Sequence, residues 1–241
     1  MTTSSKARAL VDGAIIDPSV FTLRPDYRAV LISATGIVPS PSDSASEQLL
    51  TEAETFARSN GTPLTQRPHI ATWREAYKAF GAKPAKYRNS LEALSRRIGP
   101  GTGLPRINKL TDIYNAVSVR YQIPLGGEDA AKYVGLPRLI RATGKETFHV
   151  KSGESIIVEH PEAGEVCWVD DEGVTCRRWN WRQDPRTALT DQTTEAFFIC
   201  DALSAMSDSD LAAAVDELMK HLKGLGPDVV IHQRTLRAPL A

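Results

Sequence analysis

The feature that most constrains the fold is the order of hydrophobic periodicities along the 241 residues. In the first half, apolar residues recur at every third or fourth position, which is helical spacing. Beyond Gly127 the chain breaks into short β-like runs separated by glycine-containing turns, before a closing helical segment at 211–222. A short β start, a helical middle and a β-rich second half predict an α+β fold rather than a regular βαβ alternation.

The same patterns place the individual elements. We expect helices at 47–59, 68–80, 90–98 and 111–121, and strands at 139–142, 147–150, 156–159, 166–170, 174–182 and 196–200. Near the start, 14–16 and 20–23 are expected to be short extended pieces and 27–33 a strand, whereas 124–129 is expected to be a loop. Residues 1–10 are expected to be disordered, and 11–241 to form one domain in which the helical middle packs on a mixed β-sheet.

Composition narrows the class of protein and its partners. The 29 basic and 29 acidic residues cancel, which argues against a protein that coats nucleic acid non-specifically, and no DNA partner is expected. No apolar run approaches the roughly 20 residues of a membrane helix, and the N-terminus lacks the apolar core of a signal peptide. Three cysteines without metal-binding spacing, Cys167, Cys176 and Cys200, indicate small buried thiols in a reducing compartment. A cytoplasmic protein without a membrane partner is expected.

Charge is strongly segregated along the chain. Residues 67–110 hold ten basic and two acidic residues, whereas 151–176 hold one basic and seven acidic residues. A basic helical middle of this kind can meet a phosphate backbone. The candidate RNA-binding residues are Lys83, Lys86, Arg88, Arg96 and Arg97. The alternative is that these side chains belong to solvated helix faces and pair with nearby acids.

A second unusual feature is the crowding of three arginines, two tryptophans and an asparagine within 176–182. If this run is a strand, Arg178, Asn180 and Arg182 share one face, and Arg177, Trp179 and Trp181 share the other. Arginine binds phosphates and carboxylates in bidentate fashion, and tryptophan stacks on bases. The alternative is an arginine–tryptophan stack that holds two elements of the protein together.

Several segments together resemble the free-standing B3/B4 domain family, which also occurs within the beta subunit of phenylalanyl-tRNA synthetase. The resemblance covers roughly 60–205. It is carried by the segments 69–77, 80–90 and 104–112, by Tyr114 and Asn115, and by 177–182 with Thr187 and Thr190 after it. This resemblance implies a single B3/B4-like α+β domain that binds the acceptor end of aminoacylated tRNA and edits misacylated tRNA.

The resemblance also implies roles for particular residues. The segment from 106 to 115 matches one that lines the editing pocket, Asn115 falls on a pocket asparagine, and Asn180 falls in a pocket strand. Two positions depart from the family pattern. Gly126 stands where a pocket histidine is expected, and 197–200 reads Phe-Phe-Ile-Cys where a glutamate would read a tyrosine hydroxyl. A tyrosine-specific pocket is therefore not expected.

The sequence contains no zinc-binding motif, no nucleophile elbow and no cysteine–histidine signature, so no metal or cofactor is expected. In the family that the chain resembles, the terminal ribose hydroxyl of the tRNA is thought to assist the attacking water. The candidate catalytic residues are Asn115, Asn180 and Glu128, and the candidate substrate-binding residues are Asn108, Tyr114, Arg178, Arg182 and Trp181.

Three functions follow from these features. The first is a deacylase that acts in trans on mischarged tRNA, the second is a non-catalytic RNA-binding module, and the third is a binder of a free amino acid or nucleotide. A complete synthetase is not expected, since the chain lacks ATP-binding and anticodon-binding motifs.

Overall fold

The computed structural model describes residues 6–99, 102–153 and 155–239, and it is an α+β protein, as the sequence predicts. The α-helices are α1 (Lys6–Gly13), α2 (Pro18–Leu23), α3 (Ser44–Ser59), α4 (Pro68–Ala79), α5 (Ser90–Ile98), α6 (Lys109–Arg120) and α7 (Asp208–Lys223). The first strands are β1 (Ile15–Ile16), β2 (Arg28–Thr35), β3 (Leu125–Asp129), β4 (Arg138–Arg141), β5 (Phe148–Ser152) and β6 (Ser155–Glu159). The remaining strands are β7 (Val166–Val169), β8 (Val174–Arg177), β9 (Arg182–Gln183), β10 (Glu195–Ala202) and β11 (Val230–Arg237).

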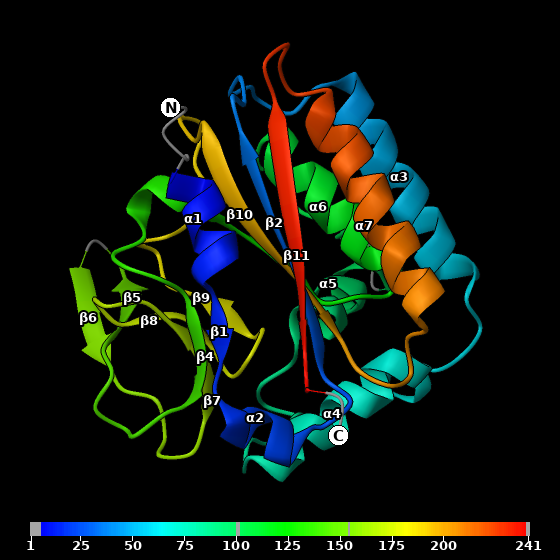
Figure 1. The fold of residues 1–241 in the computed structure, drawn as a ribbon. Helices are drawn as coiled ribbons and strands as arrows, with labels where there is room; N and C mark the ends of the chain where they lie inside the picture. The colour runs from blue at the N-terminus through cyan, green and yellow to red at the C-terminus, as the bar shows by residue number, and fades with distance from the viewer. Residues whose placement is uncertain (1–5, 100–101, 154, 240–241) are drawn as a thin grey trace.

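A four-stranded antiparallel sheet with the order β11-β2-β10-β3 crosses the middle of the molecule (Figure 1). In its register Phe198 of β10 lies between Ile32 of β2 and Gly127 of β3. A Cβ atom at Gly127 would lie 2.7 Å from a ring carbon of Phe198. The glycine therefore lets β3 pair closely beside a large aromatic side chain.

The second sheet has five strands in the order β1-β4-β7-β8-β9, and β5 and β6 form a separate hairpin. All neighbouring strands of the five-stranded sheet are antiparallel except β1 and β4, so this is the mixed sheet of the protein. Figure 1 shows it on the opposite side of the central sheet from α3, α6 and α7.

Alternate residues of the central strands face two different cores. Leu31 and Phe197 pack with Trp168 and Leu139 of the five-stranded sheet, whereas Ile32 packs with apolar residues of α6 and α7. The helical middle thus packs on the sheets as expected: Ile113 of α6 lies in the core beside the antiparallel sheet, and Trp73 of α4 lies in the other core with Trp168 of the mixed sheet. The mixed sheet covers the other face of the antiparallel one.

Three local expectations outside the arginine–tryptophan segment are wrong. Residues 6–10 are helical rather than disordered, because Ala7 and Leu10 are buried in the core, while 1–5 lie outside the described residues. Residues 20–23 belong to α2, since Asp17 accepts a hydrogen bond from the Ser19 N–H and a proline opens the first turn. Residues 125–129 form β3, since pairing with β10 overrides the local preference of two glycines.

Cys167, Cys176 and Cys200 are all free and buried. Within the described ranges, no helix is both long and apolar enough to span a membrane.

Candidate functional site

The arginine–tryptophan segment is a hairpin rather than one continuous strand. β8 ends at Arg177, and Arg178 and Trp179 then adopt φ angles of 47° and 69° before β9 begins at Arg182. Two consecutive residues with positive φ reverse the chain direction, as in tight β-hairpin turns. The predicted alternation of faces through 176–182 is therefore wrong, and residues 178–181 form a turn of their own.

Buried contacts hold this turn in its unfavourable backbone conformation. The Glu165 carboxylate accepts hydrogen bonds from two guanidinium nitrogens of Arg177, each at 2.9 Å, and from the backbone N–H of Arg178 at 3.1 Å. The fully buried Trp179 ring packs edge-on against Tyr27 and Trp73, with ring centroids 4.9 and 5.3 Å apart. Positive φ at non-glycine residues costs about 1–3 kcal/mol each, and such strain is often found at functional sites.

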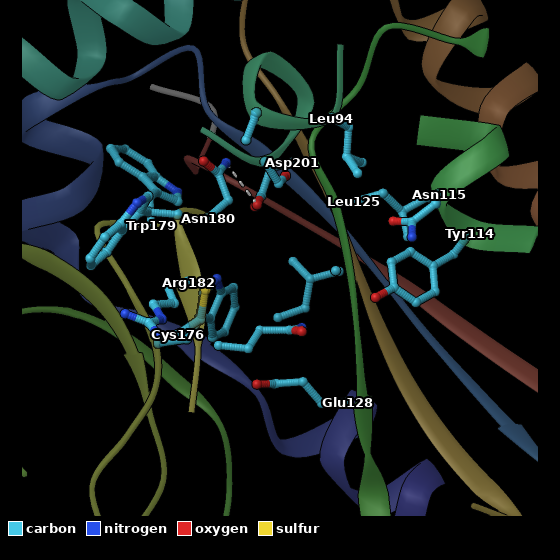
Figure 2. Close-up of a pocket in the computed structure, with 17 residues that line it drawn as sticks. Leu94, Tyr114, Asn115, Leu125, Glu128, Cys176, Trp179, Asn180, Arg182 and Asp201 are labelled. Carbon is cyan, nitrogen blue, oxygen red and sulfur yellow. Dashed lines mark hydrogen bonds between the residues drawn. The ribbon is translucent and has the colours of Figure 1, made fainter. Parts of the chain in front are cut away.

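The turn forms one wall of a cavity of about 210 Å³ that lies between α5, α6, β3 and the two sheets (Figure 2). The cavity brings together six of the predicted site residues, which are Tyr114, Asn115, Glu128, Asn180, Trp181 and Arg182. Its other polar lining residues are Ser90, Gln183 and Asp201. Residues far apart in the sequence thus meet around one space that is open to solvent.

Asn180 is fixed by a chain of buried hydrogen bonds. Its side-chain Nδ2 donates to Asp201 at 3.1 Å, and its Oδ1 accepts from the hydroxyl of Tyr77 at 2.9 Å. Asp201 also accepts a hydrogen bond from the hydroxyl of Tyr27 at 2.5 Å. The amide of Asn180 therefore has a single orientation toward the cavity.

Two buried carboxyl groups line the cavity. Burial raises the pKa of Glu128 to about 7, although Tyr133 and Thr187 each donate a hydrogen bond to it. Burial likewise raises the pKa of Asp201 to about 7. Both groups therefore change protonation near neutral pH, which suits a group that accepts or donates a proton during catalysis.

Tyr114 and Asn115 reach the cavity from α6, as Figure 2 shows. Tyr114 packs against Phe198 with ring centroids 6.1 Å apart, and burial raises its pKa to about 12. Asn115 is 6% exposed, and its side-chain amide makes no hydrogen bond to any described part of the protein. Its donors and acceptor are thus available to a ligand.

Two predicted substrate-binding residues lie outside this cavity. Asn108 caps the N-terminus of α6, where its Oδ1 accepts a hydrogen bond from the Thr111 N–H at 2.8 Å. Arg178 points away from the cavity into a neighbouring hollow, with its guanidinium 3.6 Å from the centre of the Tyr87 ring. Asn108 therefore caps a helix, and Arg178 faces the neighbouring hollow rather than the cavity.

The predicted RNA-binding residues lie on α5 and on the segment that precedes it. Lys83 and Lys86 are exposed and line the hollow beside Arg178. Arg96 pairs with the fully buried Glu92, which also accepts from Arg74. Arg88 and Arg97 form no ion pair within the described ranges.

Asp201 and Gln183 are functional candidates that the sequence did not single out. Asp201 directly follows the apolar run of β10. An acidic residue at the end of a buried strand is the sequence signal that could have identified it. Its role depends on Tyr27 and Asn180, which come from distant parts of the chain. Gln183 donates to the backbone oxygen of Gly127 at 3.0 Å and so joins the hairpin to β3.

The cavity has hydrogen-bonding groups and titratable acids. Among the residues that the structure describes, no group of three or more His, Cys, Asp or Glu side chains is placed to hold a metal ion. The fold and site therefore define an α+β protein with a small cavity, lined by both apolar and hydrogen-bonding side chains and flanked by basic residues, between two sheets and two helices.

Comparison with known proteins identifies the family. The B3/4 domain description matches residues 72–229, which is more than half of the chain, and the protein belongs to the B3/4 domain family. No curated protein matches the chain.

One solved structure that resembles this fold is an N-terminal fragment of the phenylalanyl-tRNA synthetase beta subunit from Pyrococcus horikoshii. Its TM-score is 0.46 at 10% identity, over 92% of this chain and 53% of that chain. This chain thus spans about half the length of that fragment.

Proposed function

We propose that this protein binds tRNA and hydrolyses the ester bond of mischarged aminoacyl-tRNA. The observation that carries the proposal is the cavity that unites Asn115, Asn180 and Glu128 within a B3/4 domain. Ligand sites for drug-sized molecules usually measure about 300–1,000 Å³. A cavity of about 210 Å³ is smaller and suits a compact group such as an aminoacyl moiety.

The lining residues support specific roles in ester hydrolysis. The unpartnered amide of Asn115 is available to donate a hydrogen bond to the ester carbonyl oxygen and to the oxyanion that develops there. Glu128, whose pKa burial raises to about 7, is the candidate to accept a proton from the attacking water. Asn180, held by Asp201 and Tyr77, shapes the wall opposite Asn115.

The basic residues outside the cavity supply the contact to RNA. Lys83, Lys86, Arg88 and Arg97 lie on the segment that also carries Ser90 and Leu94 of the cavity wall. A ligand that places its aminoacyl group in the cavity therefore extends over cationic side chains, which attract a phosphate backbone.

The test is to incubate the purified protein with a panel of misacylated tRNAs and to follow release of the amino acid. Release from one or a few species that is faster than in buffer would establish a deacylase and identify its substrate. Absence of acceleration with every species would reject the hydrolytic part of the proposal. The salt dependence of binding separates the remaining functions, since a tRNA ligand gives a steep slope and a free amino acid a shallow one.

A further inference from the structure

A second hollow lies beside the cavity, on the other side of the turn at 178–181. It measures about 410 Å³. Its charged and aromatic lining residues are Phe80, Lys83, Lys86, Tyr87, Glu162, Glu165 and Arg178. The α4–α5 connection forms one wall, and the segment before β7 forms another.

Arg178 in this hollow lacks sufficient counter-charge. It is only 5% exposed, and its Nη1 has no hydrogen-bond partner in the described structure. The nearest acid, Glu165, bonds Arg177 through two contacts of 2.9 Å and approaches Arg178 only to 3.5 Å. Burial lowers the pKa of Arg178, as expected for a guanidinium that has lost water without gaining a full partner.

Two lysines add positive charge at the mouth of the hollow. Lys83 and Lys86 are exposed, and neither forms an ion pair within the described ranges. Lys86 lies 5.0 Å from the centre of the Tyr87 ring. Of the two acids in the lining, Glu165 is already bonded to Arg177, so the cations outnumber the acid that remains, Glu162.

We propose that this hollow binds a phosphate group, held by Arg178, Lys83 and Lys86. A phosphate offers several oxygens at once to separate cationic donors, which a single carboxylate does less well. The phosphate site is distinct from the aminoacyl cavity. Two stretches of the chain, the turn at 178–181 and residues 80–94, contribute to both sites. Arg178 faces the hollow whereas Trp179, Asn180 and Trp181 line the cavity. The segment before α5 borders the hollow, and α5, which follows it directly, borders the cavity.

This shared wall indicates which phosphate is bound. An aminoacyl group in the cavity is esterified to the terminal ribose, and the phosphate of that nucleotide is the one that we assign to the hollow on the other side of the turn. That assignment to a tRNA phosphate rests on the proposed function, whereas the phosphate site itself does not.

The test compares wild-type protein with the double variant Lys83→Gln/Lys86→Gln by calorimetric titration with adenosine 5′-monophosphate, adenosine and inorganic phosphate. Both lysines are exposed, so the variant is expected to fold. Lys220→Gln, which removes an exposed lysine of α7, is the matched control. Wild-type protein should bind the monophosphate at least about tenfold more tightly than adenosine, and the double variant should lose that preference.

Equal affinity of wild-type protein for the monophosphate and adenosine would overturn the proposal, as would an unchanged preference in the double variant. Competition with uncharged tRNA then identifies the source of the phosphate. Displacement of the monophosphate by tRNA supports an RNA phosphate, and failure to displace it overturns that assignment in favour of a free nucleotide. Absence of the phosphate preference in wild-type protein that does deacylate tRNA would reject this site while leaving the proposed function intact.

Discussion

Asn180 donates a hydrogen bond of 3.1 Å to Asp201, although 21 residues separate them in sequence. Asp201 is 2% exposed and also accepts from the hydroxyl of Tyr27. One buried carboxyl group thereby joins the strained turn, the strand β10 and the first part of the chain. The orientation of the cavity wall depends on this single acceptor.

Replacement of Asp201 by Asn should weaken both stability and activity. An amide has one acceptor oxygen, so either Tyr27 or Asn180 loses its acceptor at a cost of about 1–3 kcal/mol. We expect a lower free energy of unfolding in urea and a lower deacylation rate at saturating substrate. The control is Asp216→Asn, an exposed residue of α7, which should change neither quantity. An Asp201→Asn protein with wild-type stability and rate would show that the network does not hold the wall.

The pH dependence of stability should report the burial of Glu128. Its pKa rises from 4.5 to about 7 on folding, so the native state binds the proton more tightly. The stabilising contribution is fully present below pH 4.5 and is lost as the pH rises through about 7. Relative to Glu128→Gln, wild-type protein should lose up to about 1.4 kcal/mol per pH unit in this window.

The comparison with Glu128→Gln is necessary because other groups titrate in the same range. Burial lowers the pKa of His69 from 6.5 to about 4, which makes stability rise with pH in that window. Asp201, with a raised pKa, acts in the same direction as Glu128. Urea unfolding of both proteins from pH 4.5 to 7.5 isolates the Glu128 contribution, and parallel curves would contradict its raised pKa.

Asn115→Ala and Asn108→Ala make the same chemical change at two positions associated with α6. Loss of the Asn115 amide should slow hydrolysis about 100-fold or more while leaving tRNA affinity nearly unchanged, as for removal of an oxyanion donor. Asn108→Ala should instead cost about 0.5–2 kcal/mol of stability through loss of the helix cap, with little change in rate. Initial rates, tRNA binding and urea unfolding distinguish the two. Equal loss of rate and affinity in Asn115→Ala would indicate a binding or folding role.

Glu165→Gln should destabilise the protein by about 3–5 kcal/mol, because the buried guanidinium of Arg177 would lose its buried ionised partner. The matched control is Glu159→Gln, since Glu159 pairs with the same arginine at 2.9 Å but is 45% exposed. That control should cost no more than about 1 kcal/mol. Thermal unfolding measures both, and similar losses would show that Glu165 has no special part in holding the turn.

The sequence by itself determined the fold class and the family, and it named six of the residues that line the cavity. Helical spacing and strand alternation are local properties, so α3, α4, α6, β6 and β10 lie close to their expected positions. The motifs around Asn115 and Asn180 marked residues that do face one cavity, and both residues lie within the range that matches the B3/4 domain.

Only the tertiary structure decided the conformation of 178–181, the formation of β3 and the role of Asp201. A positive φ at Arg178 and Trp179 is locally unfavourable, and it persists because Glu165 and the aromatic core hold the turn from distant positions in the chain. β3 forms through pairing with β10, and the Asp201 network joins three separate segments. Contacts of this kind depend on which segments the fold brings together, and no local pattern in the sequence records them.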